Sequence, residues 1–599
     1  MRLTIRTLVE LAEHSRARYA DRPALGTKRD GRWTWTTYRQ LGDEIVRVRA
    51  GLATLGVGKG DVVAVVASNR VEWAATCYAT YGLEATFVPM YEQQRPSEWA
   101  FILRDCGAKV VVAGSNDAFH TLTALQRDVP SLRWVIGMDL ADLDPRSFAA
   151  LARAGEVAPI GAGSPDPGDL ADVIYTSGTT GTPKGVLLSH ANLASNISAL
   201  SEVFPLEPTD RTLSFLPWAH AFGQAELHYV LSQGGSLALN DEIPHLLENL
   251  AEVAPTVLVA VPRIFYRIHA LVREQIGERP AFVQRLFEDG VRSATKRAHG
   301  EPLRWRERAA LTFDDQLVFK KIRERFGGRL RFVISASAAL SPEVAELIDA
   351  VGLPVYEGYG LTETSPAATL CTPAHRKIGS VGKPLPGVRI EIDESRGDRP
   401  GQGEIIVYGP NVMLGYHGRP EETAAALRPD GGLRTGDLGR IDEDGFLFIT
   451  GRIKELFKLE TGKYVAPAPL EETLKLSPYV ANLVLYGSDR PYVIAIVAPD
   501  AEALGRWARA AAHALEPLDR DPLVRDLITR DLAERSAGFP SYALPRKVVI
   551  APADFTIDQD LLTPSLKVKR RNVEALFARE IEAAYREPTD TRVAEPPRP

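Results

Sequence analysis

Short β-branched runs alternate with helical patterns through the first third of the chain. The runs at 61–67, 86–89 and 109–113 have the length and composition of buried strands. The segments at 70–81 and 96–104 between them read as helices. Because parallel strands need a crossover connection, this alternation predicts βαβ units in a mainly parallel sheet, and therefore an α/β fold.

The pattern changes further along the chain. Residues 265–326 are charged and helical in character, which suggests an insertion around the core. From about residue 453 a compact α+β stretch follows, ending in an amphipathic helix at 571–585. We expect a large N-terminal domain of stacked α/β sheet subdomains (1–452), a small α+β C-terminal domain (453–586) and a disordered, proline- and charge-rich tail (587–599).

Composition narrows the class of protein. The 599 residues are 45% hydrophobic and 25% charged, with a net charge of −6, so neither wholesale disorder nor a basic nucleic-acid footprint is supported. The three cysteines, at 77, 106 and 371, are too widely spaced for a CxxC zinc site. The N-terminal residues lack an apolar signal segment, and the apolar runs fall short of the ~20 residues of a membrane helix. We expect a cytoplasmic protein.

The most informative segment is YTSGTTGTPKG at 175–185, which lies between two strand-like runs. Its small residues expose backbone N–H groups, its hydroxyls add donors, and Lys184 adds a positive charge, so the loop can cradle a polyphosphate. It is not a Walker A loop, because Pro183 precedes the lysine and Gly185 follows it.

This string resembles a signature of the adenylate-forming (AMP-binding) superfamily, which includes acyl-CoA synthetases, peptide-synthetase adenylation domains and luciferases. The resemblance extends over roughly residues 8–585. It implies that the loop binds ATP and that Thr176 also takes part in binding Mg²⁺. The loop residues assigned to ATP are Thr176, Ser177, Gly178, Thr179, Thr180, Gly181 and Lys184.

The string YEGYGLTE at 356–363 resembles the second signature of the family. The resemblance implies that Tyr359 stacks on adenine, that Thr362 contacts the α-phosphate and that Glu363 helps to hold Mg²⁺. Such a role suits a hard cation that takes carboxylate and phosphate oxygens. The nucleotide-binding residues of this string also include Gly358 and Gly360.

Two further strings correspond to parts of the family's nucleotide site. The stretch SASAA at 335–339, with Ala338, stands where the family has an adenine-binding Gly-Gly-Ala-Pro-type sequence, and it departs from that sequence. The string RTGD at 434–437 resembles the ribose motif, in which Asp437 would accept hydrogen bonds from the ribose hydroxyls. The family often has an aromatic residue where this chain has Gly432.

The string at 451–464 resembles the hinge motif of the family. By this resemblance Arg452 reaches the nucleotide, Lys454 is the residue about which the small domain rotates, and Gly462 lines the channel of the thiol acceptor. Like Asp437, Arg452 read alone would be assigned to a surface ion pair.

The string LTPSLKVKRR at 562–571 resembles the C-terminal motif that carries the catalytic lysine, which we assign to Lys567. Lys569 is the alternative. A point charge on a flexible stem can stabilise both the incoming carboxylate and the α-phosphate. Leu566 replaces the usual glycine, a form that resembles the long-chain acyl branch of the family.

The string at 213–223 supplies His220, which in the family lies beside the carboxylate and acyl pocket, and we include it among the catalytic residues. Trp218, Phe222 and the residues after it would shape the pocket mouth. Because no aspartate follows His220 to pair with an α-ammonium group, amino-acid activation is less favoured, although Glu226 leaves it open.

The resemblance implies a two-step ligase. A carboxylate attacks the α-phosphate of ATP to give acyl-AMP and pyrophosphate, and the thiol of CoA then takes the acyl group. The insertion and the LTPSLK form look most like long-chain fatty acyl-CoA synthetases. The implied substrates and cofactors are a fatty acid, ATP, Mg²⁺ and CoA, with loose membrane contact and a homodimer left open.

Other functions stay open from the sequence. A fatty acyl-AMP ligase would pass the adenylate to a carrier-protein thiol, and a related ligase would activate an aryl or amino acid. A catalytically silent scaffold would bind ATP without releasing pyrophosphate. Against the scaffold stands the joint presence of Lys184, Glu363, Asp437, Arg452 and Lys567.

Overall fold

A computed structural model gives the conformation of most of the chain. It describes residues 5–176, 183–277, 279–298, 301–305, 307–308, 319–397, 399–563 and 567–586. The predictions for the loop residues 177–181 and for the tail at 587–599 lie outside these residues.

The seven-stranded sheet confirms the predicted βαβ pattern. Its strand order is β18-β8-β7-β4-β3-β5-β6, and the strands from β7 to β6 pair in parallel. The strands are β3 (Val62–Val66), β4 (Thr86–Met90), β5 (Val110–Ala113), β6 (Trp134–Gly137), β7 (Leu170–Thr176), β8 (Lys184–Ser189) and β18 (Gly415–Tyr416). Helix α3 (Val71–Tyr81) connects the neighbouring strands β3 and β4, and α4 (Pro96–Asp105) connects β4 to β5 on the other side of β3. These parallel strands are buried on both faces.

Three further sheets complete the larger part of the molecule, in the orders β11-β12-β13-β14-β15, β16-β17-β19-β20 and β2-β1-β10-β9. The strands are β1 (Pro23–Arg29), β2 (Arg32–Thr37), β9 (Arg211–Ser214), β10 (Ser236–Leu239), β11 (Val257–Ala260), β12 (Phe332–Ser335), β13 (Val355–Gly360), β14 (Ala367–Leu370), β15 (Lys383–Pro384), β16 (Arg389–Asp393), β17 (Gly403–Tyr408), β19 (Leu433–Ile441) and β20 (Leu447–Arg452). The expectation of stacked sheets in an α/β fold is therefore confirmed.

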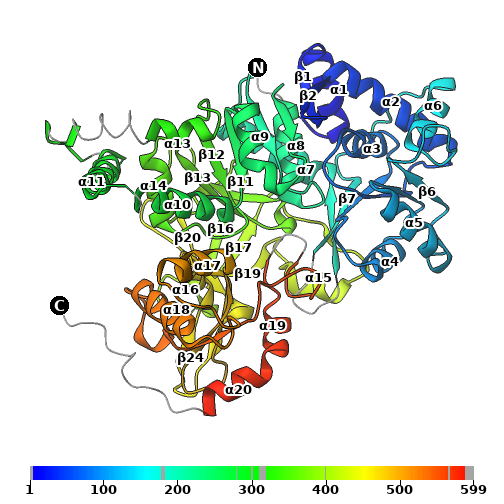
Figure 1. Ribbon diagram of the computed structural model, residues 1–599. Helices are drawn as coiled ribbons and strands as arrows, with labels where there is room; N and C mark the ends of the chain where they lie inside the picture. Colours follow the sequence, from blue (N-terminus) through cyan, green and yellow to red (C-terminus); the bar gives the residue numbers. More distant parts are fainter. Residues whose placement is uncertain are drawn as a thin grey trace.

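Helices surround these sheets and fill the described part of the predicted insertion (Figure 1). The other helices of this part are α1 (Leu8–Tyr19), α2 (Tyr38–Thr54), α5 (Asn116–Leu125), α6 (Phe148–Val157), α7 (His190–Val203), α8 (Ala221–Ser232), α9 (Leu246–Val253), α10 (Pro262–Gly277), α11 (Ala281–Ala298), α13 (Lys320–Arg325), α14 (Pro342–Ala350) and α15 (Pro420–Ala426). No helix in the described ranges is both long and apolar enough to cross a membrane.

The C-terminal part, orange to red in Figure 1, has its own sheet, β23-β24-β25, and its own apolar clusters. Its elements are β21 (Phe457–Lys458), β22 (Tyr464–Val465), α16 (Pro467–Leu474), β23 (Val480–Tyr486), β24 (Val493–Pro499), α17 (Ala501–Ala510), α18 (Pro522–Arg535), β25 (Pro545–Ile550), α19 (Arg570–Leu576) and α20 (Ala578–Arg586). The boundary near residue 453 stays a prediction.

The prediction of one helix at 571–585 is wrong. The chain forms α19 and α20, with a break at Phe577. Phe577, at the break, is buried in the same apolar cluster as Val573 and Ile581. An amphipathic pattern that continues through a bend cannot reveal the bend.

Candidate active site

The predicted phosphate loop is held at both ends by a hairpin. Thr176 at the end of β7 pairs with Lys184 at the start of β8 in antiparallel register. The Lys184 Nζ lies 3.7 Å from Glu422 Oε1 and 5.4 Å from the ring centroid of Tyr416. The Tyr416 hydroxyl in turn donates a 2.8 Å hydrogen bond to Glu363 Oε1. Two separate motifs, carrying Lys184 and Glu363, are thus brought to the same tyrosine.

The second signature places Glu363 through a strand that stops at a glycine. β13 ends at Gly360, where an added Cβ would lie 1.8 Å from the Pro366 carbonyl oxygen, so a side chain does not fit there. A 3₁₀ turn, Thr362–Thr364, follows, and Thr362 is buried. The carbonyl of Glu363 accepts a 3.0 Å hydrogen bond from the Met413 N–H, which fixes the backbone beside the carboxylate.

Asp437 lies at the centre of a buried polar cluster. The residue is 4% exposed, and its Oδ2 accepts a 2.8 Å hydrogen bond from the Tyr359 hydroxyl, while its Oδ1 accepts one of 2.6 Å from Arg452 Nε. Burial and then the Asp437 charge hold the pKa of Tyr359 well above its ordinary value. Asp437 and Arg452 therefore form an ion pair with each other. Its carboxylate is buried rather than on the surface, and the pair joins the ribose motif to the hinge motif.

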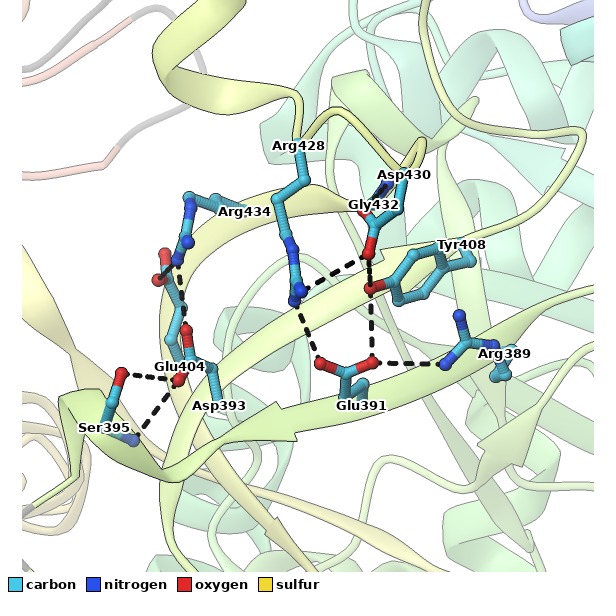
Figure 2. Close-up of polar contacts among 10 residues, drawn as sticks. All are labelled: Arg389, Glu391, Asp393, Ser395, Glu404, Tyr408, Arg428, Asp430, Gly432 and Arg434. Atoms are coloured by element: carbon cyan, nitrogen blue, oxygen red, sulfur yellow. Dashed lines mark hydrogen bonds and ion pairs between the residues drawn. The ribbon is translucent and has the colours of Figure 1, made fainter.

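The turn that carries Asp437 is held by an adjacent ionic network, shown in Figure 2. Arg434 Nη1 lies 2.9 Å from Glu404 and 3.2 Å from Asp393. The other oxygen of Glu404 accepts a 3.2 Å hydrogen bond from the N–H of Gly436, which has a φ of 71°. The left-handed backbone favours glycine at this position, and the network orients the next residue, Asp437.

The mismatch at Gly432 has a structural explanation. An added Cβ at this glycine would lie 2.7 Å from the Tyr408 ring, so the ring occupies the space of a side chain at 432. Arg389 stacks on the ring at 3.7 Å from its centroid, and the Tyr408 hydroxyl lies 3.0 Å from Asp430 and 3.2 Å from Glu391 (Figure 2). The aromatic group at this position therefore comes from β17.

Lys567 lies beside the clusters of the larger part. Lys567 is exposed to solvent, and its pKa is lowered by the protein atoms around it and next by the charge of Arg452, while Asp437, Glu455 and Glu363 act in the opposite direction. These electrostatic partners come from the second signature, the ribose motif and the hinge. Lys569 instead forms an ion pair with Asp560 at 2.5 Å. Lys567, unlike Lys569, therefore has residues of the nucleotide motifs as its electrostatic partners, which supports its assignment.

His220 precedes α8 and has a defined hydrogen-bonding state. Its Nδ1 lies 3.1 Å from the N–H of Phe222 and accepts from it, so the neutral ring carries its proton on Nε2. Burial, with a smaller effect of the Lys567 charge, lowers the pKa of His220 to about 3. The imidazole is therefore neutral near pH 7 and can donate a hydrogen bond from Nε2.

Glu226 does not have the surroundings of an ammonium-binding residue. Its carboxyl is 3% exposed and accepts hydrogen bonds from the hydroxyls of Thr212 and Ser214 at 2.9 and 2.7 Å. Burial raises its pKa to about 8. The Glu226 carboxyl comes from α8, is hydrogen-bonded to β9 and is mostly neutral at pH 7. It therefore gives no support for an amino-acid substrate.

Three more of the predicted residues are exposed. Ala338 is exposed in the turn after β12, next to Ser337, which has a φ of 79° in the left-handed region. Lys454 is exposed in the 3₁₀ turn that joins the larger and smaller parts. Gly462, in the turn between β21 and β22, is exposed, and a Cβ added there would meet no atom within 4 Å.

The sequence analysis missed Tyr416 and Tyr408. Neither residue belongs to a motif with a recognisable spacing. Tyr416 reaches Glu363 only because β18 pairs with β8. A steric conflict at Gly432 could have been inferred only from the register of β17 on β19.

The arrangement agrees with comparisons to known proteins. Residues 12–417 match the family model described as AMP-binding enzyme, and residues 454–589 match the AMP-binding enzyme C-terminal domain. The chain therefore belongs to the AMP-binding enzyme family.

Two relatives are similar to this chain over most of its length. A long-chain-fatty-acid–CoA ligase of Mycobacterium bovis is 35% identical over 579 residues, which cover 93% of each chain. A peroxisomal long-chain acyl-CoA synthetase of Arabidopsis thaliana is 31% identical over 97% of this chain and 87% of the relative.

Solved structures support the same fold. The adenylation domain of a carboxylate reductase from Mycobacterium chelonae superposes with a TM-score of 0.80, over 97% of this chain and 91% of that chain, at 24% identity. ATP-bound MatB from Rhodopseudomonas palustris superposes with a TM-score of 0.70, over 95% of this chain and 99% of that chain, at 25% identity.

Proposed function

We propose that this protein is an ATP-dependent long-chain fatty acid–CoA ligase. It converts a fatty acid to acyl-AMP and pyrophosphate, and then transfers the acyl group to CoA with release of AMP. One observation of the site supports this most directly: Lys567 lies among the electrostatic partners Glu363, Asp437 and Arg452. The fatty acid and CoA follow from relatives that carry these names over 93% of both chains.

In the first step the protein positions two anions and offsets their charge. Lys184 binds the phosphates at the loop, and Asp437 accepts hydrogen bonds from the ribose hydroxyls. Lys567 lies where it can contact the α-phosphate and the carboxylate together. His220 donates from Nε2 to a carboxylate oxygen, since its Nδ1 accepts from the protein backbone.

The second step needs a different arrangement of the small domain. Lys567 is beside the nucleotide motifs, whereas Gly462 lies in an exposed turn. We propose that this is the arrangement for acyl-AMP formation. Rotation about Lys454 then withdraws Lys567 and brings the turn of Gly462 to the acyl-AMP, where the CoA thiol attacks.

The donor groups fit a magnesium ion that is bound together with ATP. Glu363 offers a carboxylate and Thr176 a hydroxyl, the oxygen donors that Mg²⁺ prefers. Within the described ranges no group of three or more His, Cys, Asp or Glu could hold a metal, so phosphate and water oxygens would complete the shell. The ion would neutralise phosphate charge during the reaction.

Replacing Glu363 with glutamine is expected to lower acyl-AMP formation about 30-fold and to weaken Mg²⁺-dependent ATP binding, because one charged oxygen ligand is lost. Calorimetric titration of ATP with and without Mg²⁺ measures the binding. The matched control is Glu422→Gln, a carboxylate beside Lys184, which should change either quantity less than about threefold. Equal Mg²⁺ dependence in wild type and the Glu363 variant would contradict the assignment.

The function itself is tested by supplying ATP, Mg²⁺ and fatty acids from C6 to C20, with and without CoA. We expect acyl-CoA only when CoA is present, with preference for long chains, and we would follow acyl-AMP, AMP and acyl-CoA by mass spectrometry. Acyl-AMP that accumulates without forming thioester would instead support a fatty acyl-AMP ligase that uses a carrier-protein thiol.

Three further features stay predictions from the sequence: a cytoplasmic location, loose contact with a membrane and a homodimer. In the described part of the insertion, Phe282 is 70% and Trp305 is 73% exposed, which supports a peripheral contact.

A further inference from the structure

Tyr266 on α10 links the larger part of the molecule to the smaller one. Its hydroxyl lies 3.1 Å from the Ala339 carbonyl oxygen and 3.2 Å from Glu472 Oε2 on α16, and it accepts a 3.2 Å hydrogen bond from the Ser341 N–H. Ala339 closes the stretch that corresponds to the adenine-binding sequence. One tyrosine hydroxyl therefore contacts the nucleotide side of the larger part and a carboxylate of the smaller part.

The contact continues through α16 to the segment of Lys567. Glu471, next to Glu472, is 7% exposed, and its two oxygens accept hydrogen bonds of 2.7 and 2.8 Å from Arg570 Nη2. Arg570 also donates a 2.7 Å hydrogen bond to the Leu485 carbonyl. Because Arg570 follows Lys567 by three residues, α16 and the lysine segment are joined by a buried, charge-assisted pair.

We propose that Tyr266 is a positioning residue for acyl-AMP formation, which holds α16, and with it Lys567, against the nucleotide site. The proposal rests on the function proposed above. Tyr266 contacts neither substrate in this scheme and acts through Glu472 and Arg570.

The contacts of Tyr266 also allow the small domain to move away from the larger part. Its single proton can go to the charged Glu472 or to the neutral Ala339 carbonyl, and the charged acceptor gives the stronger hydrogen bond. When the small domain rotates away, the hydroxyl can still donate to Ala339, so no buried donor is left unpaired. A contact of this kind favours one arrangement without blocking the second step.

Another contact between the two parts is more exposed. Arg95 Nη1 lies 3.3 Å from Asp560 Oδ2, with side-chain exposures of 49% and 32%. Solvent-exposed ion pairs contribute little. Tyr266 is half-buried, and burial together with the Glu472 charge raises the pKa of its hydroxyl.

The test measures the two half-reactions separately in the full-length protein. Pyrophosphate release from ATP and a long-chain fatty acid without CoA reports the first, and acyl-CoA formation from synthetic acyl-AMP and CoA reports the second. Tyr266→Phe should slow the first about tenfold, in line with a lost hydrogen bond to a charged group, and change the second less than about twofold.

Two more variants make the result specific. Glu472→Gln should slow the first half-reaction about threefold, and adding it to Tyr266→Phe should cause no further loss, because both changes remove one interaction. Tyr408→Phe is the matched control: it also removes a hydroxyl bound to carboxylates, but within one sheet (Figure 2), and should leave both half-reactions within about twofold.

The outcomes separate the proposal from the function on which it rests. If the wild type forms no acyl-CoA, the proposed function fails. If it forms acyl-CoA, but Tyr266→Phe slows both half-reactions equally or neither, the positioning role is overturned and the function stands. Should the tyrosine variant not fold, Glu472→Gln decides alone, and an unchanged first half-reaction in that variant rejects the proposal.

Discussion

Replacing Lys567 with alanine is expected to slow acyl-AMP formation by about 10²–10³-fold, the usual effect of removing one key electrostatic contact with the transition state. Lys567 has Glu363, Asp437 and Arg452 among its electrostatic partners, and we propose that its ammonium group contacts the α-phosphate as charge develops there. Pyrophosphate release in the absence of CoA measures this step. Thioester formation from supplied acyl-AMP should remain within about threefold of wild type, because that step does not use the lysine.

Lys569→Ala is the control for this variant. Lys569 is two residues away and has the same chemistry, but it pairs with Asp560. It should lower acyl-AMP formation by less than about threefold, as expected for a partly exposed ion pair. Near-normal acyl-AMP formation in the Lys567 variant, or a larger loss in the Lys569 variant, would reverse the assignment.

The Asp437→Ala variant is expected to bind ATP about 10²-fold more weakly. Asp437 is the proposed acceptor of the ribose hydroxyls, and hydrogen bonds to a charged group contribute more than neutral ones. The substitution also leaves the Arg452 guanidinium without its 2.6 Å carboxylate partner, so the melting temperature should fall. Calorimetry with ATP and a thermal melt without ATP measure the two effects.

Asp393→Ala provides the comparison, since Asp393 lies in the neighbouring network but its partner Arg434 keeps Glu404 at 2.9 Å. ATP affinity in this variant should stay within about threefold of wild type. Unchanged ATP binding by Asp437→Ala would remove this residue from the nucleotide site.

The strands of the seven-stranded sheet are predicted well from the sequence because the parallel strands in it are covered on both faces. Such strands read as continuous apolar runs, and helices separate them, so β3, β4 and β5 begin and end within one residue of the predicted bounds. The bend at Phe577 was not predictable, because the apolar pattern of α19 and α20 continues across it.

The candidate site shows a similar limit. The sequence motifs alone point to Lys184, Glu363, Asp437, Arg452 and Lys567, and the fold brings these groups together. Their connections were not predictable. Tyr416 and Tyr266 reach their partners through a strand pairing and a contact between α10 and α16, and neither feature leaves a local pattern in the sequence.

Gly432 and Tyr408 together carry a consequence for comparing sequences of this family. A search pattern that demands an aromatic residue at position 432 would discard this chain, although an aromatic ring fills that space from the adjacent strand. The two positions share one space, so a side chain at 432 would require the Tyr408 ring to move. Sequence comparisons at position 432 should therefore take position 408 into account as well.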